Sequence, residues 1–453
     1  MYKKGLVWCR RDYRLQDHHA LFLAGQHCEN VVVCFIFDTN ILSHLDTTDQ
    51  RIAFIIESLR ELDDDLRGMG SKLVIRVGDP VEKCTEIITQ FGIDALYFNR
   101  DYEPYALTRD QKIHNSVSIP VHTCKDSVIF EKDEVLTQKG AYYTVFTPYK
   151  NKWLSLLGKL PTFSTPTNFL PISEESSIHE NRWFDLLGFD KKHPFLPGGR
   201  SQALRSLNQF TQWLDAYDEH RDFPHLNRTS NLSVYLRFGC VSIREMVKFC
   251  SPAKSKGAMI WLSELIWRDF YQMICHTHPN CNTKAIKPEY DRIQWLGSSE
   301  DFEAWCNGQT GYPIVDAAMR QLNTTGMMHN RCRMIVASFL CKTLLVDWRK
   351  GEAYFAKKLL DFDFASNNGG WAWASSSGCD AQPYFRIFNP YTQSQKFDSN
   401  GDYIRQYCTE LSTIAAPLIH QPAELPGYPT PIVDYAINRQ RALDMYAVVK
   451  QKV

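Results

Sequence analysis

Four stretches in the second half of the sequence combine residue types that could bind a flat, polar ligand. The first is "WLSELIWRDFY", residues 261–271. At about 100° per residue of a helix, one arc of this segment would carry Trp261, Glu264, Trp267, Arg268 and Tyr271. Rings on such a face can stack on a ligand while the carboxylate accepts a hydrogen bond from it. A packing face with a buried Glu–Arg pair would show the same pattern, so both interpretations stay open.

Two shorter stretches could bind phosphate groups or the edge of a base. "TSNLS", residues 229–233, offers hydroxyl and backbone N–H groups ahead of a predicted helix, which suits a phosphate; an ordinary helix cap would use the same residues. In "GMMHNRCRM", Asn330, Arg333 and Met334 share one helical face. An Asn and two arginines at a helix start could bind phosphate or a base edge, and a solvated cap explains the pattern about as well.

The fourth stretch, "DFDFASNNGGWAWASSSGCDAQPYFRIFNP", starts at Asp361. Asp361 and Asp363 could accept hydrogen bonds from a ligand. We expect no metal, because no nearby His or further acidic residue completes a coordination shell. The glycine pair at 369–370 predicts a flexible backbone beside Trp371 and Trp373, which would let a ligand approach closely.

Length and composition limit the class of protein. The chain has 453 residues, 44% of them apolar and 23% charged, which is typical of a folded protein with two or three domains. The 14 cysteines form no C-x-x-C pair and no His/Cys cluster at zinc spacing, which predicts reduced thiols in a cytoplasmic protein. No signal peptide and no run of about 20 apolar residues occurs, so we expect no membrane span. The formal net charge is zero, which permits a local nucleic-acid surface without establishing one.

The elements that must position these residues fall into two kinds. The first ~125 residues alternate short apolar runs with amphipathic segments, which predicts a doubly wound parallel α/β sheet. The predicted strands are Gly5–Cys9, Val31–Phe37, Leu73–Val77, Ala95–Phe98 and Val121–Cys124, and the predicted helices are Asp17–His27, Asp49–Arg67, Pro80–Phe91 and Pro104–Ser116. Ligands on such sheets bind at the carboxyl ends of the strands. Neither G-x-G-x-x-G nor a phosphate-binding P-loop occurs, which argues against a nucleotide hydrolase.

A connecting segment rich in Pro, Ser, Thr and Gly follows the α/β part. We expect an α/β domain over 1–127, the connecting segment over 128–200, and a mainly α-helical domain over 201–453 that opens with an amphipathic helix over 201–217. All four stretches therefore belong to the helical domain.

Together these segments closely resemble the photolyase/cryptochrome flavoprotein family. The segments "LVWCRRDYRLQDHHAL", "TSNLSVYLRFGCVS", "SELIWRDFY", "TGYPIVDAAMRQL", "MHNRCRM" and "NNGGWAWASSSGCDAQPYFRIFNP" occur in the order and spacing of that family, and the resemblance extends over nearly the whole chain. The pattern is most similar to the bacterial class I cyclobutane pyrimidine dimer photolyases. Cys9, Tyr13 and Phe362 depart from the residue types that are commoner at these positions.

The resemblance implies FAD, bent into a U shape inside the helical domain and reduced in the active state. The cofactor-binding residues that it implies are Tyr217, Thr229, Ser230, Asn231, Leu232, Ser233, Trp261, Asp361, Phe362, Asp363 and Asn367. Asn367 matches the residue beside flavin N5 and is the photolyase type, where plant and animal cryptochromes usually carry Asp or Cys. Trp371, Trp348 and Trp295 match the inner, middle and surface tryptophans of the family's photoreduction chain.

The activity implied by the resemblance is light-driven repair of cyclobutane pyrimidine dimers, by electron transfer from reduced FAD to a dimer flipped out of UV-damaged DNA. Glu264 would stabilise the dimer radical anion, and Trp267 and Trp373 would stack on the dimer. The residues implied to contact the lesion or nearby DNA are Arg221, Glu264, Trp267, Arg268, Tyr271, Asn330, Arg331, Met334, Trp373 and Gln393. We expect the protein to act as a monomer.

The family often holds a second, antenna pigment in its α/β domain. Folate-binding members carry an Asn–Glu pair where this chain has Tyr105 and Ala106. The residues that resemble a deazaflavin-type or flavin-type antenna set are Arg11, Phe35, Arg51, Asp101, Arg109 and Lys248. We therefore expect a deazaflavin-type pigment, with folate (methenyltetrahydrofolate) as the second choice and an empty site as the third.

Two alternatives within the family compete with dimer repair. A light-sensing cryptochrome would share the fold and the flavin without repairing DNA; such receptors commonly carry a disordered tail, and we expect none after the segment that closes this helical domain. A (6-4) photoproduct photolyase needs a histidine pair in the segment "MMHNRCRM", where His329 is the single histidine. Both features favour repair of cyclobutane dimers.

Overall fold

The structure is a computed structural model that describes residues 1–178, 182–191, 193–250, 255–421 and 427–450. The chain divides into two compact units, each built from several sequence segments. Unit 1 comprises Met1–Glu134, Trp153–Asp215 and Ser230–Asp269, and unit 2 comprises Val135–Lys152, Ala216–Thr229 and Phe270–Val453. Because the units interleave along the chain, they do not follow the limits 1–127, 128–200 and 201–453, and those domain limits stay a prediction.

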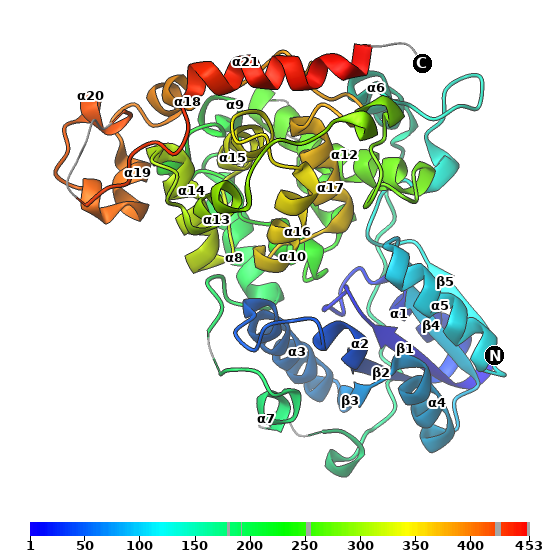
Figure 1. The fold of residues 1–453 in the computed structure, drawn as a ribbon. Helices are drawn as coiled ribbons and strands as arrows, with labels where there is room; N and C mark the ends of the chain where they lie inside the picture. Colours follow the sequence, from blue (N-terminus) through cyan, green and yellow to red (C-terminus); the bar gives the residue numbers. More distant parts are fainter. Residues whose placement is uncertain (179–181, 192, 251–254, 422–426, 451–453) are drawn as a thin grey trace. The chain divides into compact units, whose positions relative to one another are not determined.

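Unit 1 is built on a five-stranded parallel sheet (Figure 1). Its strands are β1 (Tyr2–Cys9), β2 (Cys28–Asp38), β3 (Val74–Gly78), β4 (Ala95–Asn99) and β5 (Val121–Cys124). They lie in the order β3-β2-β1-β4-β5, and Val7 of β1 is in register with Val33 of β2 and Tyr97 of β4. The five predicted strands and their parallel arrangement are confirmed. The strand order reverses between β1 and β4, and parallel sheets bind ligands beside such a switch point.

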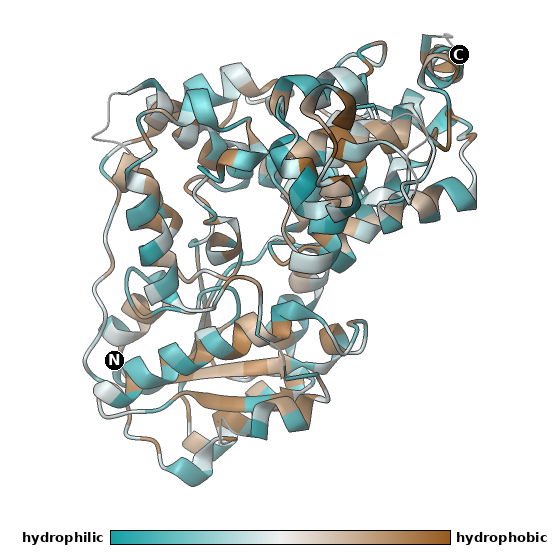
Figure 2. Cartoon of the chain, turned by 90° about the vertical axis from the view of Figure 1, so that its left-hand side faces the viewer, coloured by the Kyte–Doolittle hydropathy of each residue, from teal (hydrophilic) through white to brown (hydrophobic). Residues whose placement is uncertain are grey.

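Helices pack on the sheet because its strands carry apolar side chains on both faces. These helices are α1 (His19–His27), α2 (Thr39–Leu42), α3 (Gln50–Gly68), α4 (Pro80–Phe91) and α5 (Pro104–Ser116). Leu6 and Trp8 of β1 share a buried cluster with Ile87 of α4 and Ile113 of α5. In Figure 2 the strands are brown, whereas the helices mix teal and brown. Each fully buried side chain of this kind stabilises the fold by about 1.5–3 kcal/mol.

Two helix starts show how local contacts decide the boundaries in unit 1. Asp79 accepts a hydrogen bond from the N–H of Val81 at 2.9 Å and Pro80 opens α4, as predicted. The helix predicted from Asp17 instead begins at His19. Asp17 has a left-handed backbone with φ 49°, its carboxylate bonds to Ser242 and Arg244, and the His18 side chain caps α1.

The remaining helices of unit 1 are α7 (Trp183–Leu187), α8 (Arg200–Thr211), α10 (Ser233–Arg237) and α11 (Ile243–Cys250). The helix predicted over 201–217 is therefore too long, since α8 ends at Thr211. The carbonyl oxygens of Leu214 and Asp215 would lie only 2.2 and 2.5 Å from a Cβ on Gly257. This close backbone approach needs a glycine at 257 and takes residues 214–215 off the helical path.

A buried ion network joins the segment after β1 to α11. Asp126 bonds to Arg14 and to Arg244 at 2.7 Å each, and Arg244 also bonds to Asp17 at 3.0 Å. Burial alone would raise the pKa of Asp126, but the two guanidinium groups hold that pKa well below its usual range. The network compensates charges that would otherwise be too costly to bury.

Unit 2 is helical over its described residues. Its helices are α9 (Tyr217–His220), α13 (Ser299–Asn307), α14 (Pro313–Thr325), α15 (Asn330–Lys342), α16 (Trp348–Lys358), α17 (Phe364–Ala374), α18 (Pro390–Phe397), α19 (Asp402–Tyr407), α20 (Ala416–Ile419) and α21 (Tyr435–Tyr446). Two further helices, α6 (Phe146–Leu156) and α12 (Lys256–Thr277), have residues in both units. Short 3-10 helices occur at Lys132–Glu134, Glu174–Ser176, Pro224–Leu226, Pro288–Arg292, Thr409–Leu411 and Ala447–Lys450.

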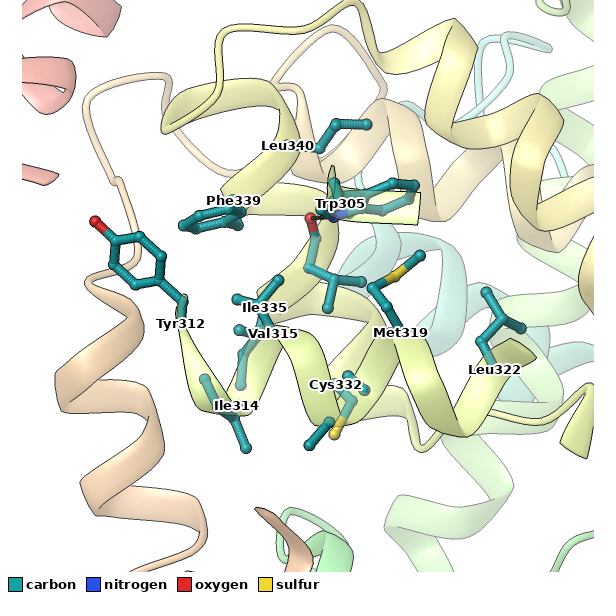
Figure 3. Close-up of a cluster of buried hydrophobic side chains, with 14 of the residues drawn as sticks. Trp305, Tyr312, Ile314, Val315, Met319, Leu322, Cys332, Ile335, Phe339 and Leu340 are labelled. Carbon is teal, nitrogen blue, oxygen red and sulfur yellow. Dashed lines mark hydrogen bonds between the residues drawn. The ribbon is translucent and has the colours of Figure 1, made fainter. Parts of the chain in front are cut away.

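The core of unit 2 surrounds Trp305 of α13. Figure 3 shows this side chain among Met319, Ile335 and Phe339, with its indole N–H donating to the Val336 carbonyl at 3.1 Å. The Trp305 ring also stacks on Phe355 of α16, with centroids 6.0 Å apart. A fully buried, hydrogen-bonded tryptophan fixes α13, α15 and α16 against one another.

Candidate functional site

The glycine pair at 369–370 lies inside a helix, so the expected flexible backbone is wrong. α17 begins after its cap residue Asp363, whose carboxylate accepts hydrogen bonds from the N–H and the hydroxyl of Ser366. A Cβ on Gly369 would lie 2.2 Å from the Tyr271 ring, whereas a Cβ on Gly370 would meet nothing within 4 Å. Gly369 is therefore required by packing against Tyr271, and Gly370 leaves space beside the helix.

The side-chain amide of Asn367 is oriented by Glu352 of α16. Its Nδ2 donates to Glu352 Oε1 at 2.9 Å and to the Glu352 carbonyl at 3.1 Å. Burial raises the pKa of Glu352, which favours the protonated carboxyl group. With Nδ2 engaged in this way, Oδ1 is the atom with which Asn367 can accept a hydrogen bond from a ligand.

Asp361 and Arg333 form an ion pair close to the start of α17. Arg333 Nη2 lies 3.0 Å from Asp361 Oδ1 and 2.9 Å from Oδ2, and Arg333 Nε donates to the Met328 carbonyl at 2.9 Å. The carboxylate is buried, while the guanidinium group stays partly exposed. Phe362 packs against the apolar core of unit 2. Segment 361–367 and α15 thus offer a carboxylate, a guanidinium group and an amide to a polar ligand.

The three tryptophans of the predicted electron route belong to one apolar cluster. Trp371 and Trp348 are buried members of the cluster, and Trp295 packs against it. Trp371 meets Phe355 edge to face, with centroids 5.1 Å apart, and Trp295 meets Tyr446 in the same manner at 6.0 Å. The guanidinium group of Arg349 lies 4.8 Å from the Trp348 ring centroid. Because Trp371 and Trp348 are buried in this cluster, their rings are shielded from water.

The aromatic and charged face predicted in residues 261–271 lies on α12. Trp261 is buried against Phe210 and Phe249, with ring centroids 5.3 and 5.9 Å away. The other four members of the face are partly exposed: Glu264, Trp267, Arg268 and Tyr271. Glu264 and Arg268 are thus only partly buried, and the role of this face in binding a ligand stays a prediction.

A second set of predicted residues meets around Asp222. Arg331 Nη2 lies 2.8 Å from Asp222 Oδ2, and Arg221 Nε lies 4.0 Å from Asp222 Oδ1. The Arg331 guanidinium group also stacks on Phe397 at 4.2 Å. Phe397 lies one helical turn from Gln393 on α18, so three predicted DNA-binding residues come together in unit 2.

The start of α15 confirms the predicted helical face. Asn330 Nδ2 lies 3.9 Å from Met334 Sδ, one turn along the helix. His329 caps α15 by accepting a hydrogen bond from the N–H of Arg331 at 3.1 Å. Burial lowers the pKa of His329 to about 4, so this imidazole is neutral near pH 7. Trp373 of α17 is partly buried against the core of unit 2.

Two family models match most of the chain. The model described as "DNA photolyase" matches residues 5–167, and the one described as "FAD binding domain of DNA photolyase" matches residues 261–448. The chain is also 38% identical to the deoxyribodipyrimidine photo-lyase of Escherichia coli (strain K12), with 98% of this chain and 99% of that protein covered.

This chain belongs to the DNA photolyase family. A second relative, the deoxyribodipyrimidine photo-lyase of Vibrio cholerae, is 37% identical, with 98% of this chain and 99% of that protein covered. The similarity to this family therefore extends over 98% of the chain and includes the segments between the motifs.

Solved photolyase structures share the fold. A bacterial class III photolyase from Agrobacterium tumefaciens has a TM-score of 0.91 and 33% identity, with 100% of this chain and 98% of that chain covered. An archaeal photolyase from Sulfolobus tokodaii, described with two FAD molecules, has a TM-score of 0.86 and 35% identity, with 98% and 99% covered. A cryptochrome from Synechocystis sp. PCC6803 has a TM-score of 0.88 and 26% identity, with 98% and 99% covered. The predicted order of an α/β part followed by a helical part is confirmed.

The photolyase-family residues expected to bind FAD fall in both units. Ser230, Asn231, Leu232, Ser233 and Trp261 belong to unit 1, while Tyr217, Thr229, Asp361, Phe362, Asp363 and Asn367 belong to unit 2. Leu232 occupies the cap position of α10 without a side-chain hydrogen bond, so the ordinary-cap interpretation of "TSNLS" is wrong. Asn231 adopts φ 52°, which turns the chain sharply before α10.

The residues expected to bind an antenna pigment are only partly brought together. Arg11, after β1, bonds to Asp101, after β4, at 3.2 Å and to Glu103 at 3.0 Å, which is the switch point of the sheet. Burial opposes the charge of Asp101, but Arg11 and the neighbouring guanidinium groups lower its pKa to about 2. Arg109 stacks on Trp8 with 4.9 Å between guanidinium carbon and ring centroid.

The other three antenna candidates make different contacts. Phe35 packs edge to face on Tyr13 at 5.5 Å, Arg51 pairs with Asp49 at 2.5 Å, and Lys248 donates to the Pro161 carbonyl at 2.6 Å. Tyr105, which replaces the folate-type Asn, donates its hydroxyl hydrogen to Asp38 at 2.6 Å. The role of these residues in pigment binding stays a prediction.

Sequence reasoning missed four residues that contact the site. Glu352 holds Asn367, Asp222 joins two arginines, Phe397 supports Arg331, and Trp305 meets Trp371 with ring centroids 6.1 Å apart. The contacts of Glu352 with Asn367, and of Asp222 and Phe397 with Arg331, join different elements and leave no periodic signal. Trp305 could have been suspected from its residue type alone.

Among the described residues, one group of three side chains could bind a metal ion. Cys9, Asp12 and His18 are buried and bring their ligand atoms together. However, His18 Nδ1 accepts from the N–H of Leu21 at 3.1 Å and its Nε2 lies 3.0 Å from Asp12 Oδ2, so both ring nitrogens are already engaged. Separately, no helix in the described part of the chain is long and apolar enough to cross a membrane.

Proposed function

We propose that the protein binds FAD and uses light to split cyclobutane pyrimidine dimers in DNA. The observation that carries the proposal is the arrangement of α15, α16 and α17, which contact one another: Arg333 of α15 pairs with Asp361 in the turn before α17, and α17 carries Asn367 and Trp371. Relatives named deoxyribodipyrimidine photo-lyase, 37–38% identical over 98% of the chain, support it.

The residues of this segment suit the flavin ring system. An isoalloxazine edge alternates N–H donors with carbonyl and ring-nitrogen acceptors, and segment 361–367 with Arg333 supplies complementary acceptors and donors. Bound in its reduced form, FAD supplies a photoexcited electron to the dimer and recovers it after the ring opens, without net redox change. Gly370, open at its Cβ position, lets a flat group lie close to α17.

The residues in and around segment 361–367 then have distinct roles. Glu352 fixes the Asn367 amide so that Oδ1 points its lone pairs at one ligand atom. Arg333 pairs with Asp361 and so compensates the cost of burying that carboxylate. Trp371, Trp348 and Trp295 share an apolar cluster, which supports the proposal that they pass an electron between α17 and the surface.

DNA binding is assigned to the exposed side chains of α12 and to the residues around Asp222. Extracting a base costs a few kcal/mol, less for a distorted lesion, and each stacked ring returns ~1–3 kcal/mol. Trp267 and Trp373 would stack on the dimer, Glu264 would stabilise its radical anion, and Asn330 and Met334 would line it. Arg221, Arg331 and Gln393 would contact phosphates nearby, with Arg268 and Tyr271 completing the surface of α12.

A second, antenna pigment beside the Arg11–Asp101 pair is also proposed. We favour a deazaflavin-type or flavin-type pigment over folate, because Tyr105 stands where folate-binding members carry Asn. The Sulfolobus tokodaii photolyase, described with a second FAD as a light-harvesting cofactor, supports this choice. The class I type, the monomeric state and the cytoplasmic location belong to the same proposal.

The test is an absorbance spectrum of the purified protein followed by a repair assay. We expect one FAD per chain and loss of cyclobutane dimers from UV-irradiated DNA under blue light but not in darkness. Equal repair in darkness, or purified protein without flavin, would contradict the proposal. A protein that binds FAD and responds to light without repairing dimers would be a cryptochrome-type photoreceptor instead.

A further inference from the structure

Two cysteines lie in contact where α12 ends. Cys275 is in the last turn of α12, and Cys281 is in the turn that follows. Their Sγ atoms are 3.6 Å apart and share a hydrogen bond, and neither residue is in a disulfide. A disulfide needs about 2.05 Å between the sulfur atoms, so closure requires the two side chains to move closer together.

Exposure and acidity separate this pair from the other thiols. Of the 14 cysteines, Cys275 and Cys379 are partly exposed, while Cys281 and all the rest are buried. The hydrogen bond between the two thiols lowers the pKa of Cys281, although burial opposes this shift. Burial raises the pKa of Cys379. A reachable sulfur beside a thiol that ionises more readily than usual is the arrangement of a reactive dithiol.

We propose that Cys275 and Cys281 form a redox site that closes reversibly into a disulfide when a peroxide is present. The Cys275 thiolate attacks one oxygen of hydrogen peroxide, the O–O bond breaks, and hydroxide leaves, which produces a sulfenic acid. Cys281 loses its proton, its thiolate attacks the Cys275 sulfur, and the S–S bond forms, while the sulfenic oxygen takes up a proton and leaves as water. In total, two thiols lose two electrons and two protons, and the peroxide becomes two waters. A small dithiol reverses the reaction by thiol–disulfide exchange.

The turn between the two cysteines is exposed at its centre and is hydrogen-bonded to α17. Pro279 and Asn280 are exposed, and the N–H of Cys281 donates to the His278 carbonyl at 2.9 Å. The carbonyl of Cys281 accepts a hydrogen bond from Asn368 Nδ2 at 2.9 Å, and Asn368 is a buried residue of α17 next to Asn367. Both cysteines and α17 belong to unit 2. Oxidation of the pair would therefore take place next to the helix that carries Asn367 and Trp371.

The test uses the full-length protein and needs neither light nor DNA. Trypsin releases residues 269–284 as one peptide that holds both cysteines, because no Lys or Arg occurs between Arg268 and Lys284. After limiting hydrogen peroxide and alkylation, we expect this peptide to escape alkylation and to weigh about 2 Da less than the dithiol form. Treatment with dithiothreitol should restore both alkylation sites.

Matched variants separate a paired site from general oxidation. Cys275→Ser and Cys281→Ser should each abolish the 2 Da loss, whereas Cys379→Ser, at the other partly exposed cysteine, should keep it. Full alkylation of the wild-type peptide after peroxide would overturn the proposal. So would stepwise addition of oxygen to Cys275 without pairing, or a disulfide from Cys275 to Cys379. The wild-type result alone decides the matter if a serine variant fails to fold.

Discussion

Asp126 and Asp222 each lie between two arginines, yet their surroundings differ. The side chains of Asp126, Arg14 and Arg244 are 3%, 1% and 6% exposed, whereas those of Asp222 and Arg331 are 35% and 15% exposed. Water cannot replace a lost partner in the first network, but water or a phosphate can do so in the second. A carboxylate between two guanidinium groups therefore stabilises the fold when the three side chains are buried. When they are partly exposed, the same arrangement leaves the arginines available to a ligand.

The largest expected effect comes from breaking the buried network. Asp126→Asn should lower the free energy of unfolding by about 3–5 kcal/mol, because two buried guanidinium groups lose a shared carboxylate. Urea unfolding followed by circular dichroism measures the change. Asp222→Asn is the matched control and should cost no more than about 1 kcal/mol. Equal losses in the two variants would show that burial does not distinguish the networks.

The pH dependence of stability sharpens the same contrast. The pKa of Asp126 is held well below its usual range by Arg14 and Arg244. Since its folded pKa lies below the unfolded value of about 3.9, its contribution is present above that pH and is lost as the pH falls through the folded pKa. Unfolding midpoints measured from about pH 5 down to about pH 2 should thus fall less steeply for Asp126→Asn than for the wild type. Identical slopes would mean that Asp126 does not carry this dependence.

An aromatic contact offers a third comparison, between lesion recognition and general DNA affinity. Trp267 is partly exposed on α12 and should stack on the flipped dimer. Trp267→Ala should weaken binding to dimer-containing DNA about 5- to 150-fold, the equivalent of ~1–3 kcal/mol, and barely change binding to undamaged DNA. Parallel titrations on both DNAs measure the difference. Equal weakening on both would identify Trp267 as a packing residue.

Removing an arginine of the exposed network should act on all DNA alike. Arg331→Ala should weaken binding to damaged and undamaged DNA by a similar factor and reduce the salt dependence by about one counterion, because a phosphate contact carries no lesion information. Titrations at several salt concentrations give both quantities. A loss confined to damaged DNA would place Arg331 at the lesion rather than at a phosphate.

The smallest expected effect is a gain. Asp222 pairs with Arg331, with 2.8 Å between Oδ2 and Nη2, and would compete with a DNA phosphate for that guanidinium group. Asp222→Asn should therefore strengthen binding to both DNAs by up to about fivefold, the equivalent of the ~1 kcal/mol of an exposed ion pair. The double variant with Arg331→Ala is the control and should show no gain. Weaker binding by the single variant would mean that Asp222 positions Arg331 instead of competing for it.

The parts of the fold that follow a short-range pattern were predictable. The five strands are apolar runs bounded by turn residues, and the cap at Asp79 is a local contact, so both followed from neighbouring residues. The start of α1 and the end of α8 were not predictable in the same way. Asp17 is held by Arg244, and residues 214–215 lie against Gly257, so distant parts of unit 1 decide both boundaries.

The candidate site shows the same division. The face of α12 and the Asn330–Met334 pair follow from helical spacing, while the roles of Asn367 and of the tryptophans came from resemblance to a family. Glu352 could not be found in either way, because its hydrogen bond to Asn367 joins two helices. The prediction of a flexible backbone at the glycine pair 369–370 also failed for a physical reason. Gly369 lies in a helix, and Tyr271 packs where a side chain at 369 would be.

The approach of α16 to Trp371 restricts which sequences can share this fold. A Cβ at position 351 would lie 2.2 Å from the Trp371 ring, so no larger residue fits at 351 while the indole keeps its place. A smaller residue at 371 would remove this contact, and the end of the Leu340 side chain, whose Cδ2 lies 2.5 Å from the same Cβ position, would have to shift as well. The fold should therefore not tolerate alanine at 351 while tryptophan occupies 371, but should tolerate it when 371 carries a smaller residue. The two positions are then epistatic, and fewer single substitutions are open to this pair than to its neighbours.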